Sequence, residues 1–358
     1  MKRRWVRWLP AAVIPAAIAA GALIAPMAAG AADLPSKTPS DVLKLVAASD
    51  VRAFSGTIEQ SSDLGLPSMP SVSGGGAASS SSSDASDALE LLTGSHTAKV
   101  YADGPTKARV QVLDQLAERD VVRNGSDVWL YTSTGTKVTH VTLPSRTAEK
   151  TTPDASTTTP AQLAQRFLAA VDDSTAVTLG DNTKVAGRDA YDLVLTPRTS
   201  ATLVGSVSIA VDGATGVPLS VQVDARGQST PAFEVAFSTF DPSAPSADVF
   251  AFTPPAGATV TEQALPAPGS HARASDKGKA ADHPEPVVSG SGWSSIVTAS
   301  VGAVPASVTS SPLFAQLTTA VPGGRAFSTS LVSVLLTDDG RVLAGAVPVS
   351  ALEAAAAK

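Results

Sequence analysis

Apolar and polar residues alternate along residues 191–240, and this pattern is the strongest structural signal in the chain. Four runs follow one another, each with an apolar side chain at every second position. These positions are Tyr191, Leu193, Leu195, Val207, Ile209, Val211, Leu219, Val221, Val223, Phe233, Val235 and Phe237. A period of two predicts strands with one buried and one solvated face. Turn-forming residues at 212–218 and 226–229 separate the later runs, so we predict an antiparallel meander with one apolar surface.

A second group of predicted strands precedes this meander. The candidates are residues 54–60, 96–101, 107–113, 117–123, 127–133 and 137–143. The Asn-Gly pair at 124–125 is the strongest short hairpin signal among the turns. In the strand at 127–133, Trp129 and Tyr131 alternate with Val128 and Leu130. Apolar residues on both faces are typical of a central strand, and they also indicate a second covered face.

Two amphipathic helices with strong N-terminal caps are predicted, one before each group of strands. Thr38 and Thr159 are each followed by proline, and Asp41 and Gln162 then complete capping boxes. Apolar residues recur on one face of each helix. The predicted order is helix, six strands, helix and five or six further strands. Because strand runs are set apart from helices, this order predicts an α+β antiparallel architecture.

Charge and composition narrow the classes of partner. The net charge of the 358 residues is −6, and without the four basic residues of the first eight positions it is near −10, since 22 bases then face 32 acids. Such a balance argues against nucleic acid as a partner, because phosphate contacts need clustered lysine or arginine. Cysteine is absent. Disulfides, thiolate metal sites and a lipid-modified N-terminal cysteine are therefore excluded.

The N-terminus predicts export. Residues 1–8 are basic, residues 9–32 carry no charge, and Ala29-Gly30-Ala31 has the form of a signal peptidase site. We therefore assign residues 1–32 to a signal peptide. The uncharged run exceeds a signal core of roughly 7 to 15 residues, so an uncleaved membrane anchor is the alternative. Either way, the folded part is expected in the extracytoplasmic cell envelope or outside the cell.

The remaining chain divides into a main domain, a linker and a small C-terminal module. The main domain spans residues 33–255 and contains a Pro-, Gly- and Ser-rich insertion at 65–88, which we expect to be disordered. Residues 256–292 are predicted to form a linker. Residues 293–358 are predicted to form a small α/β module with strands at 295–299, 327–336 and 341–347 and helices at 312–319 and 350–358, docked on the main domain.

Residues 38–253 resemble the superfamily of outer-membrane lipoprotein carriers, the LolA-like proteins, and their actinobacterial exported relatives. The resemblance is carried by the capped helix running into residues 51–60, by the hairpin at 186–195 and by the pattern at 209–219. It implies an incomplete antiparallel β-barrel whose concave apolar face is covered by helices and holds acyl chains. The same fold occurs in regulators of envelope-stress signalling and in mycobacterial lipid-carrying lipoproteins. This chain departs from those lipoproteins because it has no cysteine to acylate.

A search for catalytic and metal-binding motifs finds none. His96 and His140 lie in predicted strands, and no H-E-x-x-H, G-x-S-x-G or phosphate-binding glycine loop is present. Asp338-Asp339-Gly340 lacks the spaced acids of a calcium loop and is interpreted as a hairpin turn. We therefore predict no catalytic residue, no metal and no cofactor, and classify the protein as non-enzymatic.

Three functional hypotheses follow. The first is an exported carrier or binding protein for lipid or lipoprotein acyl chains, which occupy an apolar groove between the sheet and the helices at 39–48 and 160–171, near a membrane surface. The second is an envelope sensor or regulator of the same fold that binds a protein such as an anti-sigma factor. The third is an enzyme with an unrecognised site. The predicted groove-lining residues, for which ordinary core packing is the alternative, are Val110, Val112, Leu130, Phe167, Val207, Ile209, Val221 and Val223.

Overall fold

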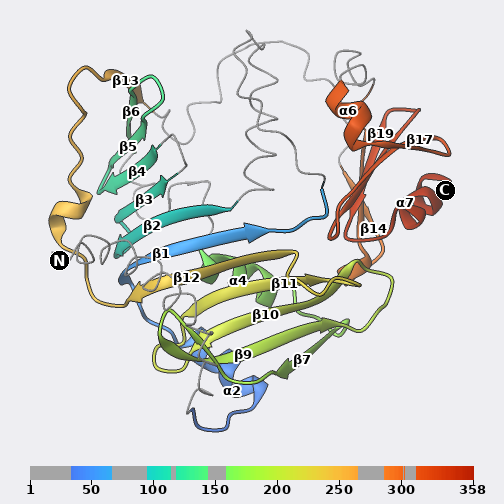
Figure 1. Cartoon of the computed structure of the whole chain (residues 1–358), viewed down its shortest axis with the longest axis horizontal. Coiled ribbons are helices and arrows are strands. Elements are labelled where there is room, and N and C mark those ends of the chain that lie inside the picture. Colours follow the sequence, from blue (N-terminus) through green and yellow to red (C-terminus); the bar gives the residue numbers. More distant parts are fainter. Residues whose placement is uncertain are drawn as a thin grey trace, which may run out of the picture.

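The computed structural model describes residues 34–66, 95–113, 118–143, 159–264, 286–300, 302 and 312–358. It shows a large curved sheet, helices on part of one side, and a smaller C-terminal module (Figure 1). The predicted signal peptide at 1–32 lies outside the described residues, as does nearly all of the insertion at 65–88. The middle of the predicted linker, residues 265–285, also lies outside them.

The large sheet contains 13 strands, and its order shows two meanders joined side by side. Along the sheet the order is β13-β6-β5-β4-β3-β2-β1-β12-β11-β10-β9-β7, with β8 pairing to β9. The strand bounds are β1 (Ala53–Ser62), β2 (His96–Asp103), β3 (Lys107–Leu113), β4 (Glu118–Asn124), β5 (Asp127–Thr132), β6 (Lys137–Thr142), β7 (Thr175–Leu179), β8 (Thr183–Val185), β9 (Arg188–Pro197), β10 (Val204–Asp212), β11 (Pro218–Ala225), β12 (Phe233–Asp241) and β13 (Thr259–Ala264). The sheet path does not close, because β7 and β13 end it without pairing to each other. This is the predicted α+β fold, an antiparallel half-barrel with helices on it.

Both predicted helices of the main domain form, and both begin at the predicted caps. Helix α2 (Pro39–Ala47) starts after Thr38, whose side chain accepts a hydrogen bond from the backbone N–H of Asp41. Helix α4 (Pro160–Ala169) starts after Thr159, which has the same reciprocal arrangement with Gln162. The fully buried side chains of Val42 and Ala164 point from these helices into the main core. α2 packs on β7 and β9, and α4 packs on β11 and β12.

The chain after β12 crosses the other side of the sheet instead of leaving it as a linker. A short 3-10 helix, η2 (Ala247–Phe250), packs on β3 and β4, and β13 then pairs with β6. This pairing is parallel, unlike every other strand pair described in the sheet. Residues 256–292 were predicted to form a linker, and this is wrong for residues 259–264, which form β13 of the large sheet. Its short run, Thr259–Ala264, holds a single large apolar residue, Val260, and shows no clear alternation.

The C-terminal module is a six-stranded sheet with a helix on one face. Its order is β14-β15-β19-β18-β17-β16. The bounds are β14 (Val287–Ser289), η4 (Gly292–Ser294), β15 (Ile296–Ser300), α6 (Pro312–Leu317), β16 (Thr319–Val321), β17 (Gly324–Ser328), β18 (Ser333–Thr337), β19 (Arg341–Gly345) and α7 (Val349–Ala356). The single strand predicted at 327–336 is in fact a hairpin, because a hydrogen-bonded turn at 329–332 separates β17 from β18.

The module is fixed to the half-barrel by hydrogen bonds and by shared apolar packing. The indole Nε1 of Trp293 donates to Thr175 Oγ1 at 2.8 Å, and the backbone N–H of Leu203 donates to the carbonyl of Ala346 at 2.8 Å. A third contact joins the N–H of Ser330 to the carbonyl of Leu64. Trp293, Ala346 and Leu331 also pack on the main core. The module is therefore held at several points along one end of the strands.

Candidate functional site

One face of the large sheet, which we call the inner face, is apolar across the β9–β12 half. It is the face on which α2 and α4 pack. In the β9–β12 half, the strand register places Leu193, Ile209, Val221 and Val235 in one row, and each of them is at most 1% exposed. The row beside it contains Leu195, Val207 and Val223. These side chains form the centre of the main hydrophobic core.

The inner face continues into the first meander. The register places Val100, Val110, Val121 and Leu130 in one row across β2 to β5. Exposure increases along this row, from 2% at Val100 to 41% at Leu130. The described helices have their main contacts on β7, β9, β11 and β12. This apolar row thus continues the inner face beyond the part on which the helices pack, with Arg119 and Arg123 of β4 on either side of Val121.

The eight predicted groove-lining residues all belong to this inner face or to the helix that packs on it. Val207, Ile209, Val221 and Val223 are buried in the main core, and Val110 and Phe167 are partly buried against it. Val112 is 6% exposed, in the row that begins with Ile58. Leu130 is the most exposed of the eight. Sequence reasoning did not select Val121, because it is adjacent to Val122 and the two apolar residues leave the direction of the strand faces ambiguous.

Side chains fill the region between the helices and β9–β11. Val42 of α2 and Ala164 of α4 have no exposed surface, and Phe167 and Leu168 pack on the same core. A hollow of about 240 Å³ lies elsewhere, on β1, β2 and β12, and side chains of Lys99, Tyr101 and Asp241 line it. These three residues alternate with residues of the inner face, so the hollow opens on the opposite, outer face.

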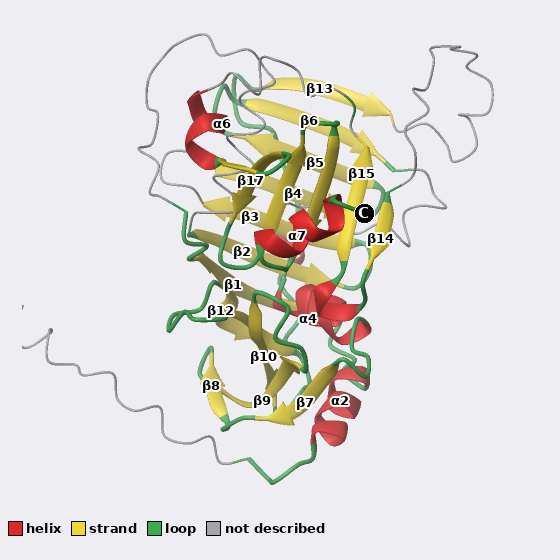
Figure 2. Cartoon of the chain, turned by 90° about the vertical axis from the view of Figure 1, so that its right-hand side faces the viewer, coloured by secondary structure: helices red, strands yellow, loops and turns green. Residues whose placement is uncertain are grey.

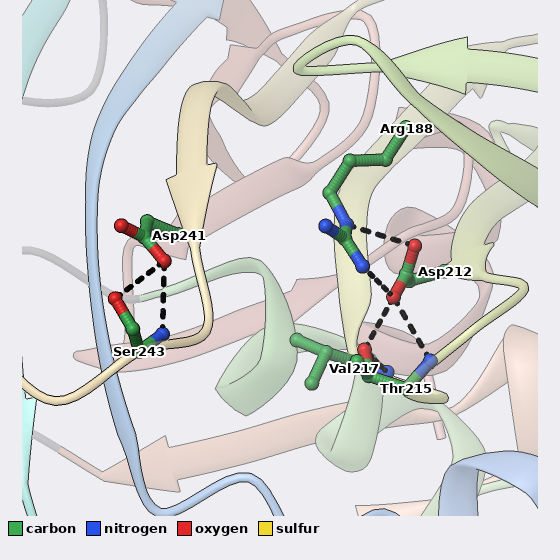
Figure 3. Close-up of polar contacts among 6 residues, drawn as sticks. All are labelled: Arg188, Asp212, Thr215, Val217, Asp241 and Ser243. Atoms are coloured by element: carbon green, nitrogen blue, oxygen red, sulfur yellow. Dashed lines mark hydrogen bonds and ion pairs between the residues drawn. The ribbon is translucent and has the colours of Figure 1, made fainter.

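An ion pair holds the turn beneath α2 (Figure 3). Arg188 donates to both carboxylate oxygens of Asp212, which also accepts hydrogen bonds from the N–H and hydroxyl of Thr215. Burial would raise the pKa of Asp212, but the bonds from Arg188 and Thr215 outweigh it and hold this pKa below its usual value. The turn continues to Gly216, which lies against the backbone of Leu45 in α2. The ion pair therefore positions the helix that covers one end of the inner face.

The outer face of β3–β6 is covered by the chain's own crossing segment. Arg109 forms an ion pair with Asp120, which is 2% exposed, and its guanidinium also donates to the carbonyl of Val249. Burial raises the pKa of Asp120 in spite of the bonds from Arg109. Phe252 packs on the ring of Trp129. Sequence reasoning missed this cover, because the phenylalanines of residues 250–252 stand in a Pro- and Ala-rich stretch.

His140 of β6 is held in place by ring stacking and by two polar contacts with carboxylates. The ring of His140 stacks on Trp129 at 3.9 Å, and its two nitrogens contact Asp127 and Glu262 at 3.0 and 2.8 Å. These contacts fasten β13 to β6. Among the residues that the structure describes, no three histidine or acidic side chains are grouped so as to hold a metal ion. The helices in the described ranges are all too short or too polar to span a bilayer.

Comparison with known proteins gives one family and several distant structures. The model of a family described as "Predicted periplasmic protein (DUF2092)" matches residues 77–262, which include most of the half-barrel. The structure of the Pseudomonas aeruginosa MucA/MucB complex matches at 17% identity and a TM-score of 0.42, covering 88% of this chain and 96% of that chain. No curated protein matches the sequence.

Two further structures match a smaller share of the chain. One is a LolA superfamily protein from Nitrosomonas europaea, at 10% identity and a TM-score of 0.23, covering 61% of this chain and 99% of that chain. The other is a putative outer membrane lipoprotein-sorting protein domain from Vibrio parahaemolyticus. It matches at 10% identity and a TM-score of 0.23, covering 60% of this chain and 95% of that chain.

Proposed function

The chain belongs to the DUF2092 family of predicted periplasmic proteins and is an exported protein, and we propose that it is a non-enzymatic carrier of lipid or lipoprotein acyl chains. The proposed site is the inner face of the half-barrel. The observation that carries the proposal is the exposure of this face in β2–β5. There the apolar row that is buried at Val100 ends at Leu130 with 41% of its surface exposed.

An alkyl chain fits this surface for a simple energetic reason. Each CH₂ group that leaves water for an apolar surface contributes about 0.8 kcal/mol, so a long acyl chain binds through contact alone. The side chains of Val110, Val121 and Leu130 offer such contact and carry no charge. Binding of this kind needs no catalytic group and no cofactor.

The buried half of the inner face suggests how the site is divided. We propose that the acyl chain first contacts Val110, Val121 and Leu130, which lie outside the main footprint of the helices. Val207, Ile209, Val221 and Val223 lie beneath α2 and α4 in the packed core. A ligand reaches them only if α4 moves away together with Phe167.

The test is mass spectrometry of an organic extract from protein purified from its native envelope without detergent. The wild-type protein is expected to release an acylated species in stoichiometric amount. Leu130→Glu places a charge in the proposed contact surface and should reduce this amount about tenfold or more, since 1.4 kcal/mol corresponds to a factor of ten. Because Leu130 is exposed, the substitution should leave the fold and the thermal midpoint intact.

Val260→Glu is the matched control. Val260 is 43% exposed and lies two strands from Leu130, but the register of β13, β6 and β5 places it on the outer face. This variant should retain the acylated species at the wild-type level. A wild-type protein that is stable and reproducibly empty would contradict the carrier function. An empty protein that copurifies in fixed ratio with an envelope protein would support the sensor hypothesis instead.

A further inference from the structure

After β12 the chain crosses the outer face of the first meander, and we call residues 247–264 of this crossing the strap. The strap begins with η2 on β3 and β4 and ends with β13, which pairs with β6 at the edge of the large sheet (Figure 2). Between these two elements, Phe252 packs on the rings of Trp129 and Tyr131, with centroid distances of 5.5 and 6.2 Å. The strap therefore covers aromatic side chains of β5.

The two ends of the strap are held differently. At η2, Phe250 is 1% exposed, and the guanidinium of Arg109 donates to the carbonyl of Val249 at 3.1 Å. At β13, residues 259–263 are all exposed. Among the described residues, the only side-chain hydrogen bond of β13 is the contact between Glu262 and His140. The hold on β13 thus depends on its backbone pairing with β6 and on this one histidine.

His140 stands between two carboxylates. Its Nδ1 lies 2.8 Å from Glu262 and its Nε2 lies 3.0 Å from Asp127, while its ring stacks on Trp129. The side chain of His140 is mostly buried, whereas those of Asp127 and Glu262 are 49% and 70% exposed. Carboxylates that remain in contact with water are ionised near neutral pH and then only accept hydrogen bonds. Both nitrogens of the ring must therefore donate.

Only the protonated form of a histidine ring has two N–H groups. A neutral imidazole has one, and its second nitrogen carries a lone pair that would here face a carboxylate oxygen. Histidine side chains ordinarily change between these forms from about pH 5 to 8. The contacts of His140 therefore correspond to the imidazolium, which is also favoured by its position on the face of Trp129.

We propose that His140 is a proton-dependent clasp that holds β13, and with it the end of the strap, at mildly acidic pH and releases it as the pH rises. This device is separate from the carrier function proposed above and does not rest on it. The contact that is lost is the one with Glu262, because this exposed side chain can turn to water. Asp127 keeps the remaining N–H, since it lies on β5, the neighbour of β6 in the sheet.

The direction of the response follows from the number of bound protons. The closed strap holds a proton on His140 more tightly than the open strap does, so a rise in pH favours the open form. Carboxylates in general take up protons below about pH 4, and they then no longer serve as acceptors for an imidazolium. The clasp is therefore strongest between about pH 5 and 6.

The charged groups that face His140 are these two carboxylates. Within the described ranges, β5 carries only Asp127, and the strap carries only Asp248 besides Glu262. Asp248 belongs to η2, which packs on β3 and β4. Lys137 of β6 lies three positions from His140 and thus on the opposite face of the strand. No basic side chain of these elements therefore competes with His140 for the two carboxylates.

The first test measures amide hydrogen exchange of β13 as a protection factor, which corrects for the effect of pH on the chemistry of exchange. In the wild-type protein, the protection of β13 should fall about threefold to fivefold between pH 6 and pH 8. This is the size expected for the loss of one partly exposed ionic contact. In His140→Gln, which cannot titrate at this position, the fall should disappear.

Glu262→Gln is the sharper variant, because the position is exposed and the fold does not depend on it. A side-chain amide can accept from an N–H of the ring and can also donate to its lone pair, so the contact survives in both forms of His140. The fall in protection should therefore disappear here too. Glu59→Gln, at an exposed position on β1, is the matched control and should keep the wild-type response. An unchanged response in Glu262→Gln, or no response in the wild-type protein, would overturn the clasp.

The second test needs no variant. Hydroxyl-radical footprinting of the wild-type protein measures the access of solvent to Trp129, with Trp293 as a reference in the same chain. Because the strap places Phe252 on Trp129, oxidation of Trp129 relative to Trp293 should rise about twofold or more from pH 6 to pH 8. A constant ratio would overturn the release of the strap.

Discussion

Two hydrogen bonds, of 2.9 and 2.8 Å, join the guanidinium of Arg188 to the carboxylate of Asp212. The side chain of Asp212 is 2% exposed and that of Arg188 is 25% exposed. Because the same carboxylate also caps the turn at Thr215, one residue supports the β9–β10 pairing and the turn below α2. Because the charge of Asp212 is buried and accepts four hydrogen bonds, a substitution of this residue should lower the free energy of unfolding strongly.

Asp212→Asn should lower the free energy of unfolding by about 3 kcal/mol, because it leaves the partly buried Arg188 without its counter-charge. Denaturant unfolding monitored by circular dichroism measures this change. Asp103→Asn is the control, since the pair of Asp103 with Lys107 is more than a third exposed and should contribute less than about 1 kcal/mol. Equal effects of the two substitutions would contradict the structural role of the buried pair.

Asp192 should make the protein less stable as the pH rises from about 4 to about 6. Burial raises the pKa of Asp192 to about 6, and the charges of Asp224 and Asp181 add to this shift. The folded state thus prefers the protonated carboxyl. Its contribution to stability is full below about pH 4, declines as the pH rises, and is lost above about pH 6.

Asp192→Asn should therefore remove this dependence and stabilise the protein at pH 7 by about 1–2 kcal/mol, a figure reduced for partial exposure to solvent. Unfolding measured at several pH values between 4 and 8 tests it. Asp173→Asn, at an exposed position, should change stability by no more than about 0.5 kcal/mol. If Asp192→Asn is no more stable than wild type at pH 7, water reaches the carboxyl of Asp192 in solution and its pKa is not raised by burial.

Gly216 and Gly227 form a matched pair for the docking of α2. Both have positive φ, at 74° and 81°, so alanine is strained at either position. A Cβ at Gly227 meets nothing within 4 Å, whereas one at Gly216 collides with the carbonyl oxygen of Leu45. Gly227→Ala should cost about 1 kcal/mol, and Gly216→Ala should cost about 2 kcal/mol more. Hydrogen exchange should show faster opening of α2 in Gly216→Ala alone; similar exchange in both would contradict this contact.

Trp293 and Thr175 should be coupled, since their hydrogen bond joins the module to β7. Trp293→Phe keeps most of the packing and loses the donor, and Thr175→Val loses the acceptor. A double-mutant cycle should give a coupling energy of about 1 kcal/mol. Hydrogen exchange of β14 and β15 should increase in each single variant. Strictly additive effects would show that the hydrogen bond between Trp293 and Thr175 does not help to hold the module.

Much of the first meander and all of the second could be predicted from the sequence. The alternation around Ile209 and Val221 predicted β10 and β11, and the residues expected on one surface do share one face. The caps at Thr38 and Thr159 fixed where both helices begin. These predictions succeeded because strand period, turn chemistry and capping depend on residues close together in the chain.

The candidate site was only partly predictable, because its surfaces depend on contacts between distant segments. Leu130 lies in a strand that is apolar on both faces, and only the outer cover formed by Phe252 on Trp129 leaves its side as the accessible one. The predicted strand at 327–336 became a hairpin because residues 329–332 form a hydrogen-bonded turn within an otherwise apolar run.

The sequence by itself determined the local elements, the antiparallel order of most strands and the existence of an apolar sheet surface. The tertiary structure decided which strands end the sheet, since β13 reaches β6 only after the chain has crossed the outer face. It also decided where the C-terminal module docks, since Trp293 and Ala346 bond to segments of the half-barrel that are distant in the sequence. A repeat of two residues specifies which side chains share a face, but the direction of that face is set by long-range packing, to which a local pattern is insensitive.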